Sequence, residues 1–278
     1  MTKPFDALSY SLVDFFEEDD NADSYVYHET TKVTRRNYND LSRRNDLMTR
    51  DLQFLLMTSR GWKTYSGAER IQLPTPSLEH VSLGDAIRRR KSATSAYSGA
   101  PITLDELGGL LHYSYGTTRY IESKTFPGEK LYYRAAASAG GLYPLEIYPI
   151  VFGVDGLAPG IYHYAVIGHQ LERLREGSVL DQILEMTTYR ELASTCSVMF
   201  AISAVFPRNL SKYLFRGYRF ICHDVGVVLQ NLYLAGAGLG LGTCAIGGFF
   251  DNEVGQLLEI DNVDENVMMM FTVGKQPG

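Results

Sequence analysis

The stretch that decides the fold runs from Arg134 to Tyr148 and reads RAAASAGGLYPLEIY. Its first part, Ala135–Gly141, consists only of alanine, serine and glycine. Small side chains allow the backbone to approach a flat ligand closely, so that N–H and C=O groups can bind the ligand's edge. The same pattern is also compatible with an ordinary glycine turn. The apolar run that follows predicts a β-strand over Leu145–Val154.

Capping signals and apolar periodicity predict the elements around this stretch. Ser82 and Asp85 indicate the start of a helix that runs to about Lys91. Thr103 and Glu106 form the capping-box pattern of a helix that runs to about residue 115. The remaining predicted elements are helices over 39–57, 179–192, 218–237 and 251–258, strands over 197–206, 242–246 and 267–273, and a hairpin of 160–166 and 170–175 that turns at Gly168.

This order of elements predicts an α+β fold with a mainly antiparallel sheet and flanking helices. The helix over 218–237 is apolar almost all round, and such a helix must be buried in a large core or in an interface between subunits. We favour the interface, which predicts a homodimer. Residues 1–80 are more polar, and residues 1–75 are expected to form an extension packed on the main domain, residues 76–278.

Length, charge and cysteine content narrow the possible functions. The chain has 278 residues, with 26 Lys and Arg against 32 Asp and Glu, and a formal net charge of −6. This acidic balance argues against binding to nucleic acids or to anionic membranes. Cys196, Cys222 and Cys244 are widely spaced, which is typical of a reducing cytoplasm, and the acidic N-terminal residues do not fit a signal peptide. A cytoplasmic protein is therefore expected.

Several familiar sites are absent from the sequence. The glycines of 236–242 follow a helix instead of preceding one, which argues against a dinucleotide-binding turn. The six histidines show no metal-ligand spacing, so no metal site is expected. The uncharged stretch Val225–Phe250 is long enough to span a membrane, but its seven glycines favour a buried helix, a turn and a strand. Ser138 lacks the first glycine of a nucleophile elbow.

Six segments in a characteristic order resemble the nitroreductase superfamily and, within it, the SagB-type FMN dehydrogenases of thiazole and oxazole peptide maturation. The resemblance extends from Tyr27 to the C-terminus, and SAGGLYPLEIY is its most specific part. The segments are YHETTK (27–32), RKSAT (90–94), RAAASAGGLYPLEIY (134–148), PGIYHY (159–164), KYLFRGYRF (212–220) and GLGTCAIGGF (240–249). The resemblance implies a nitroreductase-like fold with FMN at the interface of a homodimer.

The resemblance also implies a set of FMN-binding residues. For the cationic run Arg88–Lys91, a solvated basic surface is the alternative to a phosphate clamp. Thr94 stands where a further basic residue is usual, and Ala137 stands where relatives often have proline. The matching residues are Arg90 and Ser92 for the phosphate, Ser138, Ala139 and Gly140 for the loop beneath the flavin ring, Gly247 and Gly248 for backbone donors near flavin N5, and Lys275 for a further contact to the phosphate.

Lys212 and Tyr213 match the Lys-Tyr pair that azoline dehydrogenases use for proton transfer. Burial beside a flavin would lower the pKa of a lysine toward the working pH, which suits a base. A solvated lysine beside a packing tyrosine is the alternative. The triplet Cys222-His223-Asp224 also suggests catalysis, but adjacent residues on a helix point in different directions. We therefore expect a packed cysteine with a polar pair near the interface.

The resemblance implies an FMN-dependent dehydrogenase that oxidises a heterocycle, from azoline to azole, on a peptide or carrier-tethered substrate. Cyclodehydratase-type proteins are the partners that such a reaction implies. Two alternatives remain open. One is an NAD(P)H-dependent nitro or quinone reductase, and the other is a non-catalytic flavin-binding scaffold of a peptide-modifying complex.

Overall fold

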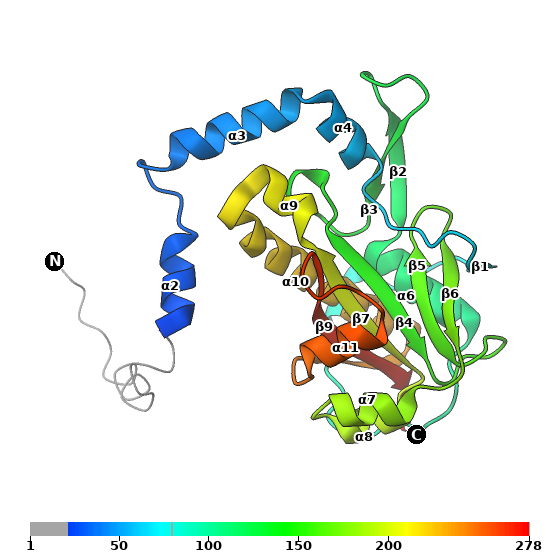
Figure 1. Cartoon of the computed structure of the whole chain (residues 1–278). Coiled ribbons are helices and arrows are strands. Elements are labelled where there is room, and N and C mark those ends of the chain that lie inside the picture. The colour runs from blue at the N-terminus through cyan, green and yellow to red at the C-terminus, as the bar shows by residue number, and fades with distance from the viewer. Residues whose placement is uncertain (1–21, 79, 278) are drawn as a thin grey trace.

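The computed structural model describes residues 22–78 and 80–277. Its centre is a seven-stranded antiparallel sheet with the strand order β1-β6-β5-β4-β7-β9-β8, and β2 and β3 form a separate two-stranded sheet (Figure 1). The predicted α+β fold with a mainly antiparallel sheet is confirmed. The strands are β1 (Glu69–Gln72), β2 (Thr117–Glu122), β3 (Lys130–Arg134), β4 (Leu145–Val151), β5 (Gly160–Ala165), β6 (Gln170–Glu176), β7 (Val198–Val205), β8 (Leu241–Ile246) and β9 (Glu265–Lys275).

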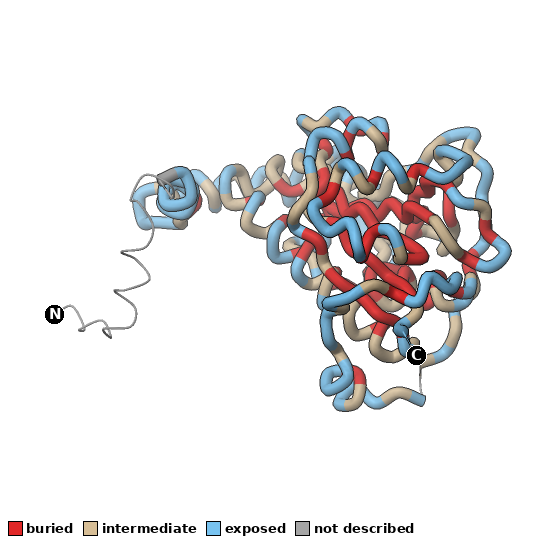
Figure 2. The backbone as a smooth tube through the Cα atoms, turned by 90° about the horizontal axis from the view of Figure 1, so that it is seen from below, coloured by how far each residue is buried: buried red, intermediate tan, exposed pale blue. Residues whose placement is uncertain are grey.

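Helices cover both faces of the sheet, and the buried core lies on either side of it (Figure 2). Strand β7 illustrates this: Phe200 and Ile202 belong to the apolar cluster with α6 and α10, whereas Met199 and Ala201 belong to the cluster with α7, α8 and α11. Because successive side chains of a strand point to opposite faces, a strand buried on both faces has a continuous apolar sequence. The helices are α6 (Leu104–Tyr115), α7 (Leu180–Met186), α8 (Arg190–Thr195), α10 (Gly217–Leu239) and α11 (Asp251–Leu257).

The capping predictions are confirmed. Helix α5 (Leu83–Arg89) begins after Ser82, whose hydroxyl accepts a hydrogen bond from the backbone N–H of Asp85 at 3.1 Å. Before α6, the N–H of Glu106 donates to Thr103 Oγ1 at 3.2 Å, and the N–H of Thr103 donates to Glu106 Oε2 at 2.7 Å. These bonds satisfy donors that a helix leaves unpaired at its N-terminus.

Two predicted helices are each interrupted. The helix expected over 39–57 is divided into α3 (Tyr38–Arg50) and α4 (Leu52–Ser59), because Asp51 is extended and its carboxylate caps α4 through the N–H of Phe54 at 2.8 Å. The helix expected over 179–192 is divided into α7 and α8, since Thr187 adopts an extended conformation and pairs with Phe249. Strands β1, β2 and β3 and helices α2 (Ala22–Thr30) and α9 (Phe206–Tyr213) were not predicted.

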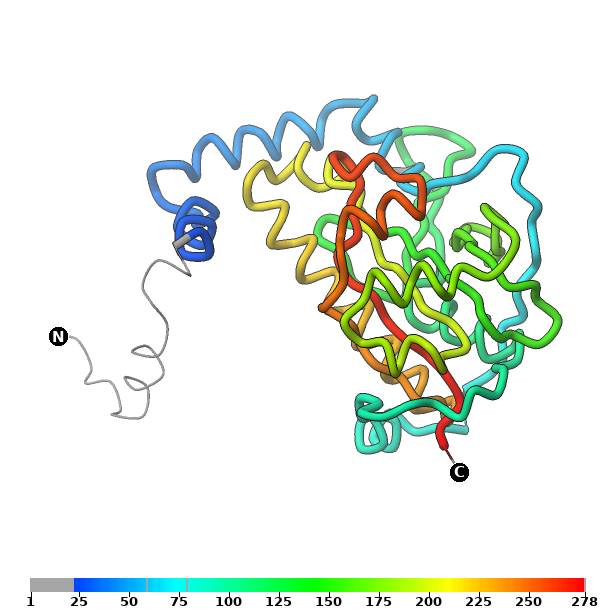
Figure 3. The backbone as a smooth tube through the Cα atoms, turned by 60° about the horizontal axis from the view of Figure 1, so that its bottom comes forward, coloured from blue at the N-terminus to red at the C-terminus, as the bar shows by residue number. Residues whose placement is uncertain are grey.

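Helices α2 and α3 form an arm along one side of the molecule (Figures 1 and 3). Beside α2, Arg219 Nε donates to Thr31 Oγ1 at 2.6 Å, and Arg216 Nη1 donates to the carbonyl of Thr31 at 2.9 Å. From α3, Arg44 Nε donates to the carbonyl of Ser211 on α9 at 2.9 Å. The predicted extension begins with residues 1–21, which lie outside the described residues. The division into an extension, 1–75, and a main domain, 76–278, stays a prediction.

A network of buried charges forms where the chain around Lys63 crosses the sheet. The ring of His163 is fully buried, with Nε2 3.0 Å from Glu146 Oε2 and Nδ1 3.0 Å from Glu172 Oε2. Arg208 Nη1 lies 2.6 Å from Glu146 Oε1, and the same oxygen accepts the N–H of Lys63 at 3.1 Å. These five residues, the Glu146 network, connect the segment before β1 with the sheet and with α9.

Helix α10 is the predicted long helix, and it is buried on one side. Val228 and Leu232 lie in the core, whereas Cys222, His223 and Gly226 are exposed. Cys222 is exposed in the single chain, so its expected packing near a subunit interface stays a prediction. Within the described residues, one helical stretch, 206–239, is long and apolar enough to cross a membrane by length and composition alone, and its most apolar 18-residue window has a mean hydropathy of 1.2 with 39% of that window buried. An amphipathic helix packed on a sheet has the same composition.

Candidate active site

The glycine loop and the Lys212-Tyr213 pair lie together, although they are more than seventy residues apart in sequence. Gly140 adopts the left-handed region with φ +65°. A Cβ atom placed on it would lie 2.4 Å from Tyr213 Oη and 3.2 Å from Lys212 Nζ. Helix α9 ends at Tyr213 and delivers both side chains to this position. The position therefore requires glycine both for its backbone conformation and for the close approach of the pair.

Asp224, on α10, holds the loop in place. Its Oδ2 lies 2.5 Å from Ser138 Oγ, which also accepts the N–H of Tyr143 at 3.0 Å. Burial raises the pKa of Asp224, while hydrogen bonds from Ser138 and from the backbone of Ala139 act in the opposite direction. Asp224 was not among the predicted site residues. Its spacing from Ile221 and Val228 on the buried side of α10 is the signal that could have identified it.

Lys212 is a partly desolvated amine. Its Nζ lies 5.3 Å from the centre of the Tyr213 ring, and that ring makes an edge contact with Phe220 at 4.9 Å. Burial lowers the pKa of Lys212; burial, followed by the charge of Asp224, raises the pKa of Tyr213. No carboxylate in the described part of the chain forms an ion pair with Lys212. An amine in this setting releases its proton more readily and can act as a base.

Ser92 and Arg90 lie at a second position, around Tyr233 of α10. The hydroxyls of Ser92 and Tyr233 are 3.0 Å apart, and the Arg90 guanidinium lies 5.5 Å from the Tyr233 ring centre. Tyr233 Oη also accepts the N–H of Ala245 from β8 at 2.8 Å. Nothing in the sequence singles out Tyr233, because an aromatic residue in an apolar helix is typical of ordinary core packing. Its hydroxyl connects the end of α5 with β8.

A cavity of about 430 Å³ beside Ser92 is suited to an anion. Arg89, Lys91 and Thr94 line it. The neighbouring Arg88 forms an ion pair with Asp85. Within 22–78 and 80–277, no carboxylate forms an ion pair with Arg89, Arg90 or Lys91. Unpaired cations and hydroxyl donors are the groups that bind phosphate through charge-assisted hydrogen bonds. These residues fit a phosphate contact at Ser92, which lines the cavity. Arg90 does not line it, and its guanidinium packs on the Tyr233 ring instead.

The remaining predicted residues, Gly247, Gly248 and Lys275, do not line the cavity beside Ser92. Gly247 and Gly248 follow β8, and the carbonyl of Gly248 accepts the N–H of Thr188 at 2.9 Å. A Cβ on Gly247 would meet no atom within 4 Å. Lys275 Nζ, however, lies 2.5 Å from Glu106 Oε1, in an ion pair that joins the end of β9 to the start of α6. Lys275 does not line the cavity beside Ser92.

The two positions lie on different sides of α10. Asp224 and Tyr233 are nine residues apart, which at 1.5 Å per residue is about 13 Å along the axis and two and a half turns. Two and a half turns place their side chains on opposite sides of the helix. In one chain, the Ser138–Gly140 loop with Lys212 and Tyr213 is thus separated by α10 from Ser92 and its cationic neighbours.

Comparison with protein families decides the relationship. The nitroreductase family model matches residues 87–275, about two thirds of the chain. The chain belongs to the nitroreductase family. Members of this family typically bind flavin, which indicates flavin-dependent oxidoreductase chemistry.

Similar proteins include both simple nitroreductases and peptide-processing proteins. The protein MJ1384 of Methanocaldococcus jannaschii, itself named as a nitroreductase, is 32% identical over 208 residues, which cover 75% of this chain and 98% of that one. The trifolitoxin-processing protein TfxB of Rhizobium leguminosarum bv. trifolii is 28% identical over 62% of this chain and 47% of its own length. The microcin B17-processing protein McbC of Escherichia coli is 27% identical over 46% of this chain and 49% of its own. This chain thus matches about half the length of each processing protein.

A solved structure supports the nitroreductase fold. The crystal structure of a nitroreductase homologue from Anabaena variabilis is similar with a TM-score of 0.68 and 28% identity, over 90% of this chain and 45% of that one. The covered share of this chain includes most of the region before the family match. Residues outside 87–275 are therefore part of a shared architecture in at least one other nitroreductase.

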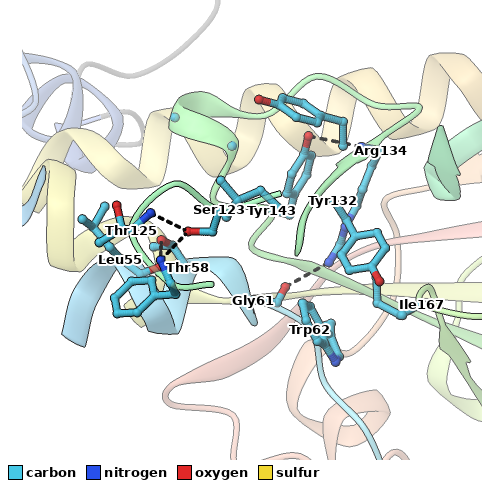
Figure 4. A pocket seen from close by; sticks show the side chains of 15 residues that line it. Leu55, Thr58, Gly61, Trp62, Ser123, Thr125, Tyr132, Arg134, Tyr143 and Ile167 are labelled. Carbon is cyan, nitrogen blue, oxygen red and sulfur yellow. Dashed lines mark hydrogen bonds between the residues drawn. The ribbon is translucent and has the colours of Figure 1, made fainter. Parts of the chain in front are cut away.

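A further cavity of this chain lies next to the glycine loop (Figure 4). It measures about 390 Å³, and Gly140 and Gly141 line it. We call it the aromatic pocket, because its lining also includes Trp62, Phe126, Tyr132, Tyr133 and Tyr143. None of these five aromatic residues was predicted as a site residue, since they lie in two segments that only the fold brings together.

Proposed function

We propose that this nitroreductase-family chain is an FMN-dependent dehydrogenase of the SagB type, which oxidises an azoline to an azole in a peptide or carrier-tethered substrate. The observation that carries the proposal is the position of Lys212 Nζ and Tyr213 Oη at Gly140 of the glycine loop. A partly desolvated amine beside a flavin-binding loop suits a reaction that removes a proton and a hydride together. The similarity to TfxB and McbC supports a peptide substrate and partner proteins of the cyclodehydratase type.

The residues present fit FMN. Ser92, with Arg89 and Lys91 beside it in the cavity, is suited to the phosphate, and Arg90 lies next to them in sequence. Ser138–Gly140 would present backbone to a flat ring. Bound FMN supplies the acceptor for the hydride. Lys212 would take the proton that leaves the azoline ring, and the hydroxyl of Tyr213 would orient the amine. The azoline loses two hydrogens in total, one as a proton to the chain and one as a hydride.

The arrangement on α10 supports a homodimer with the flavin between subunits. A helix with its side chains is about 10–12 Å thick, so one flavin does not contact both sides of it. The loop position of one chain would therefore act with the phosphate position of a second copy. The exposed side of α10, with Cys222, His223 and Gly226, is available for such a contact. We propose a cytoplasmic location, in keeping with the reduced cysteines.

The purified protein tests this proposal directly. We expect a yellow protein that releases FMN on denaturation and removes two hydrogen atoms from a synthetic thiazoline peptide, as measured by mass spectrometry. A colourless protein that takes up no added FMN would contradict the flavin proposal. Reduction of nitroaromatics by NAD(P)H, with no action on thiazolines, would favour the reductase. Bound FMN that no donor reduces would favour the scaffold.

A matched pair of glycine variants tests the contact at the loop. Gly140→Ala is expected to lower kcat by about 100-fold, because its Cβ displaces the Lys212-Tyr213 pair and small misplacements of catalytic groups cost about that much. Gly141→Ala is the control, since Gly141 has φ +66° and a Cβ there meets no atom within 4 Å. Both variants carry the same backbone strain, so any further fall in the melting temperature of Gly140→Ala reports the displacement of the pair. Equal turnover of the two variants would refute the role of the contact.

A further inference from the structure

We infer that the aromatic pocket binds a planar aromatic or heteroaromatic ring of the peptide substrate, next to the ring that is oxidised, and that the segment Leu55–Trp62 sets this specificity. The inference rests on the proposed function, because it takes the substrate to be a peptide held at the glycine loop. It goes beyond that function in assigning a recognition site to residues before the family match, 87–275.

The pocket lies against the loop on which the proposed chemistry depends. Gly140 lines the pocket, and Gly140 is also the residue over which Lys212 Nζ and Tyr213 Oη lie. Neither Lys212 nor Tyr213 lines the pocket itself. A ligand in the pocket is therefore a neighbour of the reacting group and is separated from the pair by the glycine backbone. This geometry fits a recognition site for an adjacent part of the substrate.

The walls of the pocket favour a flat ring. Figure 4 shows Leu55 and Thr58 of α4 on one side and Tyr132 and Ile167 on the other, with Trp62 below. Aromatic walls bind planar rings by offset or edge contacts, each worth about 0.5–1.5 kcal/mol beyond burial. The volume of about 390 Å³ falls within the range of about 300–1,000 Å³ for small-molecule sites. The pocket thus holds a ring with part of the attached peptide.

The wall from the leading segment is fixed in place by a buried cation. Arg134 is 7% exposed, and its Nη2 donates to the carbonyl of Gly61 at 2.9 Å. Its guanidinium lies between two rings, 4.5 Å from the centre of Tyr115 and 4.8 Å from that of Tyr143. A guanidinium packed on aromatic faces holds a defined orientation. Gly61 is therefore held against β3, and the pocket is formed before any ligand arrives.

Two further contacts join the same segment to the β2–β3 hairpin. Arg60 forms an ion pair with Glu129 beside β3. The ring of Trp62 meets that of Tyr132 edge-on, with 5.9 Å between their centres. The pocket therefore has one wall from residues before the family match and another from the hairpin. Changes in either wall leave α10 and the cationic cavity at Ser92 untouched.

Trp62 is the only tryptophan of the chain, so its fluorescence reports on the pocket alone. The probe is a synthetic peptide with one thiazole, which this enzyme cannot oxidise further, titrated into the FMN-loaded protein. We expect a saturable change in Trp62 emission with the thiazole peptide and none with the peptide that has alanine in its place. Identical responses to the two peptides would overturn the inference.

Variants separate recognition from chemistry. Trp62→Ala is expected to raise KM for a thiazoline peptide up to about tenfold, the equivalent of one aromatic contact, with unchanged FMN content and nearly unchanged kcat. Trp62→Phe keeps a ring and should resemble the wild type. If Trp62→Ala fails to fold, Tyr132→Ala tests the opposite wall, with Tyr38→Ala as control, because Tyr38 is exposed and does not line the pocket. An unchanged KM in Trp62→Ala or in Tyr132→Ala would refute the inference.

The two proposals fail in different ways. If the protein binds FMN but does not oxidise thiazolines, the proposed reaction is wrong, and the thiazole titration still decides whether the pocket binds planar rings. If thiazolines are oxidised while Trp62 emission and KM are insensitive to the pocket variants, the reaction stands and the pocket inference is wrong.

Discussion

Replacement of Lys212 by alanine will lower kcat for thiazoline oxidation by about 10²–10⁴-fold, the range for loss of a general base. The amine lies over Gly140 and has no carboxylate partner among the described residues. The variant should keep its FMN, because Lys212 is far from the cationic residues around Ser92 along α10. Anaerobic stopped-flow measurement of flavin bleaching by the thiazoline peptide isolates this step.

The pH profile distinguishes a base from a positive charge. Burial lowers the pKa of Lys212 below its ordinary value of 10.5, so the neutral amine becomes available at lower pH. Wild-type kcat should therefore rise with pH along a limb that Lys212→Ala lacks. Lys212→Arg keeps a positive charge, but its guanidinium does not release a proton, so this variant should be as slow as the alanine variant. Normal turnover in Lys212→Ala, or in Lys212→Arg, would exclude the proton transfer.

Replacement of His163 by alanine will lower the free energy of unfolding by about 3–5 kcal/mol, the range for breaking a buried charged pair. His163 lies between Glu146 and Glu172 and is fully buried. Without its ring, two carboxylates of the Glu146 network lose a partner inside the protein. Urea denaturation followed by circular dichroism measures the loss. His80, which is exposed, provides the control variant His80→Ala.

The loss of unfolding free energy in His163→Ala depends on pH in a defined direction. Burial would lower the pKa of His163, but the hydrogen bonds to Glu146 and Glu172 outweigh it and raise the pKa above 6.5. The stabilisation is therefore complete below about pH 6.5 and is lost as the pH rises through the raised value. Burial would raise the pKa of Glu146, but the charge of Arg208, followed by His163, lowers it to about 2, so Glu146 stays ionised throughout. If the difference in unfolding free energy between wild type and His163→Ala increased as the pH is raised, this account would be contradicted.

Local signals predicted much of the fold. The caps at Ser82 and Thr103 are confirmed, since a side chain that binds the first turn of its own helix needs no distant partner. The hairpin of β5 and β6 is also confirmed, because its two strands are neighbours in sequence and pair without a distant partner. The prediction of one helix over 39–57 was wrong at Asp51. Apolar periodicity does not reveal that Asp51 ends α3 and caps α4. Strand β1 was missed, since its pairing with β6 is a contact across a hundred residues.

The site was predictable only where a motif carries it. The sequence resemblance singled out Gly140 and Lys212 as candidates but did not predict their close approach, because this depends on how α9 meets the loop. The carboxylate of Asp224 binds Ser138, and the hydroxyl of Tyr233 accepts the N–H of Ala245. Neither residue was predicted, because the apolar sequence of α10 resembles that of any core helix. Lys275 was expected at the phosphate and instead pairs with Glu106, and nothing in the sequence distinguishes these partners.

The attachment of Gly61 to Arg134 has an evolutionary consequence. Arg134 belongs to the stretch that matches the family, whereas Gly61 precedes it and offers only a carbonyl, which every amino acid possesses. Side chains on either side of Gly61 can therefore mutate without loosening this link. If the aromatic pocket binds substrate as proposed, relatives with the same family core can change their substrate specificity through a few substitutions in residues 55–62, without changing the residues proposed to hold FMN.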